Sequence, residues 1–462
     1  MKLSYLTRYA IPLTLGLLLV LGFLVRLYKI DNPIADWHSW RQADTAAVTR
    51  NYVKYGIDPL YPRYDDFTDV SGKGLYNPLG FRFVEFPIFN LLHYTLYVLS
   101  PLALSLEMWG RLTSVLAAIT SAGLLFGLVK RHATLAAAFL AAAFYLFLPY
   151  NIYFTRVVLP DPLMVTLFLA ALYFHDTGRT AWTLVFGSLA ILVKPIAIFF
   201  LLPIYLKNLK LGLIMLAPFG LWRLWSHAPP EGIPASLWLL NGNRIRFKPS
   251  FFQWLFGVRL GSLILGKWAI WPFLHGLYVA PAYFGIWVIA ALLYLFTFAT
   301  GNVHHDYYQL PIIPIVSVLL AVGSVRLWSW GETFLKIWLS RLILVMTLGL
   351  GLAFSWYDIR GLYQVNNWSI VKAGAAVDRL TPPDSVVVAP YMGDTAFLYQ
   401  TNRPGFPFMY IPIKDMIDRY SADYYVSVNY DDDTRKIMAK YMVIEQTPEY
   451  VIVKLEEPVL KE

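Results

Sequence analysis

The sequence DWHSWRQADTAAVTRNY, residues 36–52, is a polar, aromatic and charged stretch that follows closely on an apolar run at residues 9–27. A run of about 20 apolar residues is long enough to form a helix that crosses the hydrocarbon core of a bilayer. Eight of the 14 acidic residues within residues 1–357 lie between this apolar run and the next one at residues 86–104, and they are Asp31, Asp36, Asp44, Asp58, Asp65, Asp66, Asp69 and Glu85. This clustering places the candidate chemistry beside the first membrane segment.

The composition is that of a polytopic membrane protein. The chain is 58% hydrophobic and only 15% charged, with a mean hydropathy of +0.52, whereas soluble domains carry about 25% charged residues. The net charge of +9 does not indicate nucleic acid, because the basic residues stand in small groups between apolar runs. The sequence has no cysteine, which excludes disulfides and thiolate metal sites. The first apolar run lacks a small-residue cleavage site, so we predict an uncleaved first span.

Charge placement predicts the topology. Apolar runs occur at residues 9–27, 86–104, 109–129, 134–150, 161–175, 180–194, 196–206, 211–226, 259–281, 283–300, 308–326 and 337–356. The run at 86–104 is interrupted by His93, Tyr94 and Tyr97, which favours a helix lying in the membrane interface. The basic groups between the other runs then fall on the N-terminal side, as the positive-inside rule requires. We therefore predict about 11 transmembrane helices and a cytoplasmic N-terminus.

The composition changes at about Asp358. Residues 1–357 carry a net charge of +13, whereas residues 358–462 carry −4. In the second part the β-rich runs SVVVAP, ADYYVSV and EYVIVKL alternate with helix-like stretches, a pattern typical of an α/β domain. We predict an all-α transmembrane domain over residues 1–357 and a small soluble α/β domain over residues 358–462, outside the cytoplasm.

Asp44 is the leading candidate for a catalytic base. Helical spacing places Asp44, Val48 and either Asn51 or Tyr52 on one face of a helix that begins near Asp44. A carboxylate at the membrane surface can take a proton from an attacking hydroxyl group. The alternative is an ordinary helix N-cap at the start of DTAAV. The neighbours of Asp44 favour the functional role, because Trp37, His38, Trp40, Arg41 and Gln42 are typical of a shell that contacts sugar or phosphate.

Further candidates lie in the loops predicted to share this outer face. Glu85 in VEFP precedes the interfacial run and is either a cavity residue or an acid that stabilises the helix start. Arg156 and Asp161 in TRVVLPDP stand between two spans, where Asp161 either caps a helix or contacts substrate or metal. Lys194 in ILVKP lies at a predicted bend in the membrane. There it costs about 2.5–3.5 kcal/mol unless paired or hydrated, so it faces a cavity or extends to the interface.

The segment HHDYYQLP adds a last polar group before a span. His304, His305 and Tyr307 could bind phosphate or sugar, form a structural metal site, or belong to an ordinary interfacial loop. Adjacent histidines on a helix point apart, and the segment lacks the HxxxH spacing of a metal site. Hydrogen bonding to phosphate or sugar is therefore the interpretation that we favour.

Together these segments resemble the membrane-embedded glycosyltransferases of the GT-C fold. The similarity is to the protein O-mannosyltransferase-like group, which includes the aminoarabinose transferase of lipid A and the Rgt-type lipopolysaccharide transferases, and it covers about residues 5–330. DWHSWRQADTAAVTRNY resembles the first-loop motif that holds the catalytic Asp, which implies this role for Asp44. VEFP, LPDP, ILVKP and HHDYYQLP resemble its later motifs, which implies substrate contacts for Glu85, Asp161, Lys194 and the His304 segment.

The resemblance implies a function at the outer face of a bacterial or archaeal plasma membrane. A sugar linked through phosphate to a polyprenyl lipid would be transferred, with inversion, to a glycan, lipid or protein acceptor. Many relatives have Glu after the catalytic Asp where this chain has Thr45, so the resemblance implies no certain cofactor, and a divalent metal ion remains open. The alternative function is a transporter or flippase for lipid-linked sugars, but the sequence shows no convincing internal repeat of the kind found in many transporters.

Overall fold

The computed structural model describes residues 2–456. It divides into two compact units, which we call unit 1 and unit 2. Unit 1 contains residues 2–30, Arg111–Arg223 and Ser236–Gly361, and unit 2 contains residues Asp31–Gly110, Leu224–Ala235 and 362–456. The first loop and the C-terminal segment, which are far apart in the sequence, therefore belong to the same unit.

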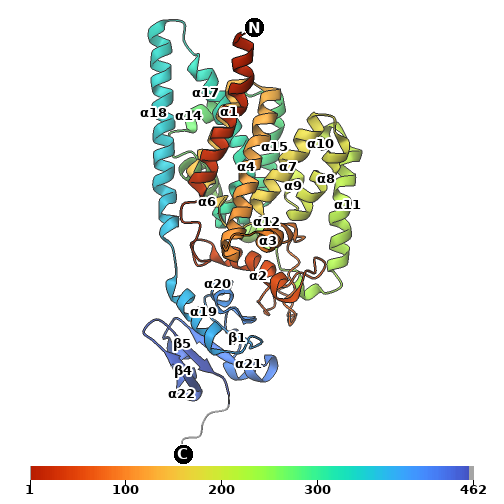
Figure 1. The fold of residues 1–462 in the computed structure, drawn as a ribbon, viewed down its shortest axis with the longest axis vertical. Helices are drawn as coiled ribbons and strands as arrows, with labels where there is room; N and C mark the ends of the chain where they lie inside the picture. Colours follow the sequence, from red (N-terminus) through yellow and green to blue (C-terminus); the bar gives the residue numbers. More distant parts are fainter. Residues whose placement is uncertain (1, 457–462) are drawn as a thin grey trace, which may run out of the picture. The chain divides into compact units, whose positions relative to one another are not determined.

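Unit 1 consists of helices, and its long helices run roughly alongside one another (Figure 1). Its elements are α1 (Lys2–Arg26), most of α4 (Leu106–His132), α5 (Leu135–Phe147), α6 (Pro149–Phe154), α7 (Asp161–Asp176), α8 (Thr180–Val193), α9 (Ala197–Phe200), α10 (Leu202–Lys207), most of α11 (Leu209–Ser226), α12 (Trp238–Asn241), η2 (Gly242–Phe247), α13 (Pro249–Phe252), η3 (Gln253–Ile264), α14 (Ile270–Val279), α15 (Ala282–Thr297), α16 (Ala299–His304), η4 (Asp306–Ile312), α17 (Ile313–Trp328) and α18 (Phe334–Ile359).

Several of these helices are apolar enough to cross a bilayer. Within residues 2–456, three helical stretches meet both the length and the hydropathy needed for a span, and they are Leu106–His132, Asp306–Trp328 and Phe334–Leu380. Shorter apolar helices cover Ala10–Arg26, Ile88–Leu99, Leu135–Phe147, Thr180–Val193 and Ala282–Thr297. The count of about 11 spans thus stays a prediction, while the prediction of a mostly helical chain is confirmed.

Glycines let helices α14 and α17 approach closely. A Cβ atom added at Gly276 would lie 1.9 Å from Leu319 O, and one added at Gly323 would lie 1.9 Å from Pro272 O. Small residues at such crossings allow backbones to approach and pack in a membrane, where apolar burial does not by itself drive helices together.

The apolar run at 259–281 is not one continuous helix. The π-helix η3 ends at Ile264, and α14 begins at Ile270. Gly266 and Lys267 between them have φ values of 53° and 62°, a left-handed conformation that ends a right-handed helix. A Cβ at Gly266 would also lie 1.8 Å from Gly351 O of α18. The break follows from this backbone turn, which hydropathy alone does not reveal.

Unit 2 combines helices with one five-stranded sheet. Its helical elements are α2 (Ser39–Tyr55), α3 (Ile88–Leu99), η1 (Pro230–Gly232), most of η5 (Arg360–Gln364), α19 (Trp368–Leu380), α20 (Thr395–Thr401), α21 (Ile413–Tyr420) and α22 (Asp432–Lys440). The strands are β1 (Val387–Val388), β2 (Gly405–Phe406), β3 (Tyr424–Ser427), β4 (Met442–Gln446) and β5 (Val451–Lys454). They lie in the order β2-β1-β3-β5-β4, with β1 parallel to β2 and β3, and β5 antiparallel to β3 and β4. The prediction of α/β structure in the C-terminal part is confirmed, and the sheet is a mixed one.

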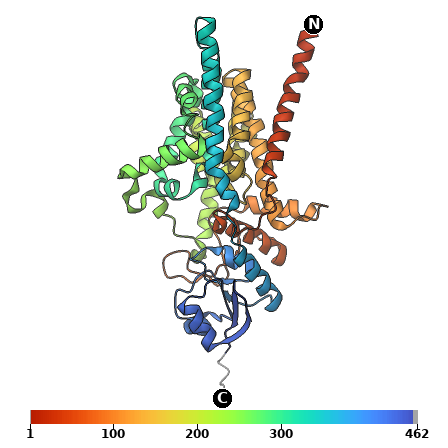
Figure 2. The same cartoon turned by 90° about the vertical axis from the view of Figure 1, so that its left-hand side faces the viewer.

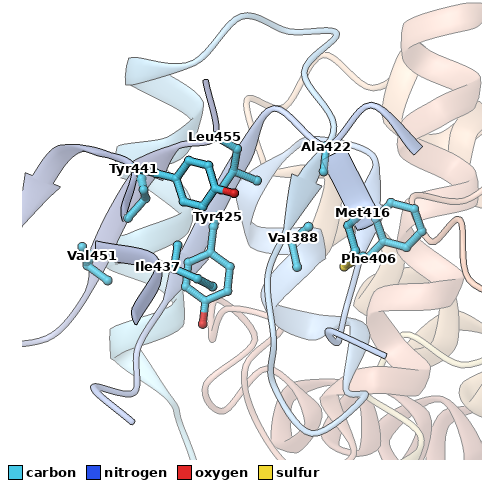
Figure 3. Close-up of a cluster of buried hydrophobic side chains, with 10 residues drawn as sticks. Val388, Phe406, Met416, Ala422, Tyr425, Ile437, Tyr441, Val451 and Leu455 are labelled. Carbon is cyan, nitrogen blue, oxygen red and sulfur yellow. The ribbon is translucent and has the colours of Figure 1, made fainter. Parts of the chain in front are cut away.

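The core of this sheet is a cluster of buried apolar side chains. Met416 of α21 and Ile437 of α22 pack with strand residues such as Tyr425 and Val451 (Figure 3). Helix α19 contacts β3 and β5, and the helices that accompany the sheet can be followed in Figure 2. The three β-rich runs expected from the sequence supply β1, β3 and β5. Strand β2, which has only two residues, and the largely exposed β4 were not predicted.

The first loop adds to the edge of the sheet. Phe67 N donates to Gly405 O, and Gly405 N donates to Asp65 O, both at 2.8 Å. A Cβ at Gly405 would lie only 1.9 Å from Val387 O of the neighbouring strand, so glycine is required where the loop, β2 and β1 meet. This pairing connects residues near position 66 to the C-terminal sheet within unit 2.

Candidate active site

Helix α2 carries Asp44 in its second turn, and not at its start. The helix begins at Ser39, after His38, which has φ 55° and ψ 38°, a left-handed conformation uncommon for a residue other than glycine. Asp44 is therefore the sixth residue of α2, which excludes the N-cap alternative and corrects the expectation that the helix begins near Asp44. The imidazole of His38 packs edge-on against Trp37, with ring centroids 5.0 Å apart.

Two ion pairs connect α2 with the end of the first loop. Arg82 Nη2 lies 2.8 Å from Asp44 Oδ2, and Arg41 Nη2 pairs with Glu85 Oε1. In each segment the arginine stands three residues before the acid, Arg41 before Asp44 and Arg82 before Glu85. Each arginine therefore pairs with the acid of the other segment. Glu85 lies two residues before Pro87, the N-cap of α3, and pairs with Arg41.

The residues around these ion pairs line a small cavity of about 10 Å³, which is room for about one water molecule. Its lining contains the candidate base with polar and apolar neighbours from both segments, namely Asp44, Thr45, Val48, Pro62, Arg82, Val84, Glu85, Pro87 and Asn90. Asn90 of α3 donates to Thr45 O at 2.7 Å and to Thr49 Oγ1 at 2.9 Å. Asp44 and Val48 share a helix face, as predicted, and the cavity places a carboxylate where a small polar group can reach it.

A second buried carboxylate lies in the same loop. Asp66 is 5% exposed and accepts a hydrogen bond from Thr68 N at 2.8 Å and from the Tyr64 hydroxyl at 3.3 Å. Burial raises the pKa of Asp66, the hydrogen bonds from Thr68 lower it and the charge of Asp44 raises it, and together these effects bring the pKa to about 6. Tyr64 also lies 4.8 Å from the guanidinium of Arg82, so Asp66 belongs to the surroundings of the cavity.

The raised pKa of Asp66 predicts a pH-dependent stability. The folded chain holds this proton more tightly than the unfolded chain, so the free energy of unfolding decreases as the pH rises from about 4 to about 6 and then levels off. A difference of about 2 pKa units corresponds to about 3 kcal/mol. We expect Asp66→Asn to melt at a higher temperature than the unmodified protein at pH 8 and at a similar temperature near pH 4, measured by intrinsic fluorescence in detergent. An equal difference at both pH values would contradict this expectation.

A separate polar cluster lies in unit 1 around Lys194. The residue lies between α8 and α9, and its Nζ donates to both carboxylate oxygens of Asp161, at 2.7 and 2.8 Å. Asp161 is the first residue of α7 and is 1% exposed. The ammonium also lies 5.6 Å from the ring centroid of Tyr307 and 5.5 Å from that of Tyr308. The structure thus joins three predicted site residues, Lys194, Asp161 and Tyr307, into one cluster.

A second buried ion pair involves Asp306, the residue directly before Tyr307. Arg259 of η3 pairs with Asp306 and donates to Val303 O at 2.8 Å. The hydroxyl of Tyr150 in α6 donates to the carbonyl oxygen of Asp306. Asp306 follows directly on His305, so the pairing holds one end of the HHDYYQLP segment.

The other predicted residues of unit 1 take different positions. His304 ends α16 and is exposed, while the His305 ring lies 5.6 Å from that of Tyr307 and 6.0 Å from that of Trp238. Arg156 is fully buried and donates to Lys29 O at 2.6 Å. Within residues 2–456 there is no group of three or more His, Asp or Glu side chains that could hold a metal ion, and Arg82 occupies one side of Asp44. The described residues around Asp44 therefore do not form a set of metal ligands.

Some residues around the site were not predicted from the sequence. Arg82 is the cation nearest to Asp44, and its only sequence signal is the matching spacing of Arg41-x-x-Asp44 and Arg82-x-x-Glu85. The other is Thr395 of α20, whose hydroxyl donates to Asp44 Oδ1 at 2.6 Å. Thr395 lies 351 residues further along the chain, and local sequence carries no signal for such a contact.

Comparisons with known proteins define the fold. No protein-family model and no curated protein sequence matches the chain. The structure of ArnT from Cupriavidus metallidurans bound to undecaprenyl phosphate aligns with a TM-score of 0.64 at 16% identity, covering 95% of this chain and 97% of that one. The apo oligosaccharyltransferase of Archaeoglobus fulgidus has a TM-score of 0.56 at 10% identity, over 89% and 69% of the two chains. AglB from the same organism, with an inhibitory peptide and a dolichol-phosphate, gives 0.53 at 11% identity over the same shares.

The chain therefore has the ArnT-like GT-C fold, and the fold expected from the sequence resemblance is confirmed. By its apolar helices and this fold it is an integral membrane protein. At such low identity the alignments establish the fold alone. Function has to be argued from the residues themselves.

Proposed function

We propose that this protein is an integral-membrane glycosyltransferase that moves a sugar from a polyprenyl-phosphate donor to a hydroxyl acceptor. The main support is the nearly full-length fold match to ArnT, which was solved with undecaprenyl phosphate, together with a buried carboxylate, Asp44, that opens on a polar cavity. AglB was solved with a dolichol-phosphate. A lipid-linked donor is the ligand class common to both.

Asp44 is proposed as the general base. It takes the proton of the acceptor hydroxyl while that oxygen attacks the anomeric carbon, and the bond from carbon to phosphate oxygen breaks, so the anomeric configuration inverts. A carboxylate has about four acceptor positions, and Arg82 and Thr395 use two of them. The acceptor hydroxyl can use another while Arg82 compensates the charge of the carboxylate.

Cations are proposed to stabilise the departing polyprenyl phosphate. Lys194 uses two N–H groups on Asp161, and an ammonium group has three, so one remains for a phosphate oxygen. His304 and His305 are proposed to add hydrogen bonds, with Arg41 or Arg156 contributing. Fixed positive groups stabilise charge that develops in the transition state more than they stabilise the substrate, so no general acid is required.

We also propose an orientation in the membrane and a site of action. The N-terminus faces the cytoplasm, residues 358–462 lie outside it, and transfer occurs at the outer face of a bacterial or archaeal plasma membrane. This assignment rests on the positive-inside pattern of the sequence. The acceptor is a glycan, a lipid or a protein.

The test is incubation of the purified full-length protein with labelled polyprenyl-phosphate sugars and membrane extract, followed by mass analysis of the products. We expect release of polyprenyl phosphate and transfer of the label to a new product. Absence of cleavage for every such donor, including slow hydrolysis, would overturn the proposal. Movement of intact donor across vesicle membranes without cleavage would instead identify a transporter or flippase.

A further inference from the structure

Helix α20 of the C-terminal segment lies directly on α2 within unit 2 (Figure 1). The Thr395 hydroxyl, at the first position of α20, donates to Asp44 Oδ1 at 2.6 Å and also lies 3.1 Å from Trp40 O. Arg82 holds the other oxygen, Oδ2, of the same carboxylate. Asp44 is thus held from two sides, once by the first loop and once by the C-terminal segment.

Hydrogen bonds from both helices fix the position of Thr395. Asp394 caps α20 by accepting from Ala396 N at 2.7 Å, and its second oxygen accepts from Ser39 Oγ at 3.0 Å. Ser39 is the first residue of α2. The starts of the two helices are therefore tied together next to the contact between Thr395 and Asp44.

The docking continues along both helices in the same direction. Arg50 donates to Tyr399 O at 2.7 Å and places its guanidinium 3.9 Å from the Tyr399 ring centroid. Further along, Lys54 donates to Asn402 O at 3.1 Å. The Tyr399 hydroxyl donates to Glu107 at 2.6 Å. A continuous set of polar contacts thus holds α20 on α2, and the hydroxyl of Thr395 is the contact that reaches the candidate base.

We propose that Thr395 is a positioning residue for Asp44, so that the C-terminal segment is part of the catalytic apparatus. This inference rests on the proposed function. A carboxylate held by one cation alone can rotate toward it, whereas two partners on different oxygens fix its plane. Because proton transfer requires donor and acceptor to be aligned, a base displaced by about 1 Å can lose about 10²-fold in rate.

The experiment compares Thr395→Val, which keeps the shape and removes the hydroxyl, with Thr395→Ser, which keeps the hydroxyl. Turnover is measured with the polyprenyl-phosphate sugar that the unmodified protein cleaves. We expect kcat to fall about 10- to 100-fold in Thr395→Val with little change in the donor KM, and we expect Thr395→Ser to regain most of the lost rate. The matched control is Thr401→Val in the same helix, whose hydroxyl donates to Leu398 O, and its kcat should stay near that of the unmodified protein.

The outcomes separate this inference from the proposed function. If the unmodified protein cleaves the donor and Thr395→Val keeps its kcat, the positioning role of Thr395 is overturned while the proposed function stands. An equal loss of kcat in Thr395→Val and Thr401→Val would show that the effect comes from the packing of α20, and it would also overturn the positioning role. If Thr395→Val does not fold, Thr395→Ala against Thr395→Ser gives the same comparison. Unmodified protein that cleaves no donor overturns both proposals.

Discussion

Replacement of Asp44 by Asn is expected to lower sugar transfer by about 10²-fold or more. The amide has nearly the same volume as the carboxylate and can still accept a hydrogen bond from Thr395, which donates to Oδ1 at 2.6 Å. What it cannot do is take the proton of an acceptor hydroxyl. The loss should therefore appear in kcat. Because the amide also leaves Arg82 without its anionic partner, a lower melting temperature is expected as well, and the rate is compared per folded protein. The measurement is the rate of polyprenyl-phosphate release at equal protein abundance in the membrane.

Asp58→Asn is the matched control for this substitution. Asp58 is an exposed acid of the same loop, and its Oδ1 accepts hydrogen bonds from Leu60 N and Tyr61 N, both at 3.2 Å, which asparagine can also accept. Its rate should equal that of the unmodified protein. Transfer by Asp44→Asn at the unmodified rate would remove Asp44 from the role of base.

Replacement of Lys194, which pairs with the buried Asp161, is expected to lower both the melting temperature and the turnover. Replacing Lys194 by Met leaves the carboxylate of Asp161, 1% exposed, without its cation. Removing one partner of a buried ion pair costs about 3–5 kcal/mol. We expect a clear drop in melting temperature and a loss of turnover in this single variant.

The double variant Lys194→Met with Asp161→Asn separates the two effects. Replacing both charges with neutral groups can be close to neutral for stability, so the melting temperature should largely recover. Turnover should stay low if the ammonium contacts the departing phosphate. Recovery of both properties would show that the pair only stabilises the fold. Lys336→Met, at an exposed lysine of the same unit, should change neither and serves as the control.

The same tripeptide, Asp-Thr-Ala, shows what local sequence can and cannot predict. It occurs at 44–46 and at 394–396, and by itself it is typical of a helix start. Asp394 is indeed the N-cap of α20, whereas Asp44 lies in the second turn of α2. The difference arises because His38 takes a left-handed conformation that lets α2 begin at Ser39, and residue type gives little indication of that backbone state.

Periodicity and charge predicted the features that depend on neighbouring residues. The helix face of Asp44 and Val48, the bend at Lys194 and three of the strands follow from spacing within short segments. The contacts of Asp44 with Arg82 and Thr395 depend on how distant segments pack. The sequence gives one indication of the Arg82 contact, which is the equal spacing in Arg41-x-x-Asp44 and Arg82-x-x-Glu85. That spacing is informative only once the two segments are known to be neighbours.

The pairing of the first loop with β2, through Asp65, Phe67 and Gly405, has a consequence for biosynthesis. Unit 2 is assembled from residues that leave the ribosome at opposite ends of translation, and most of the helices of unit 1 are made between them. Closing such long loops slows folding. The first loop therefore cannot pair with β2 until the last quarter of the chain has been synthesised. The surroundings of Asp44 would be completed only after most of the membrane helices have been synthesised, which would delay activity in a nascent chain.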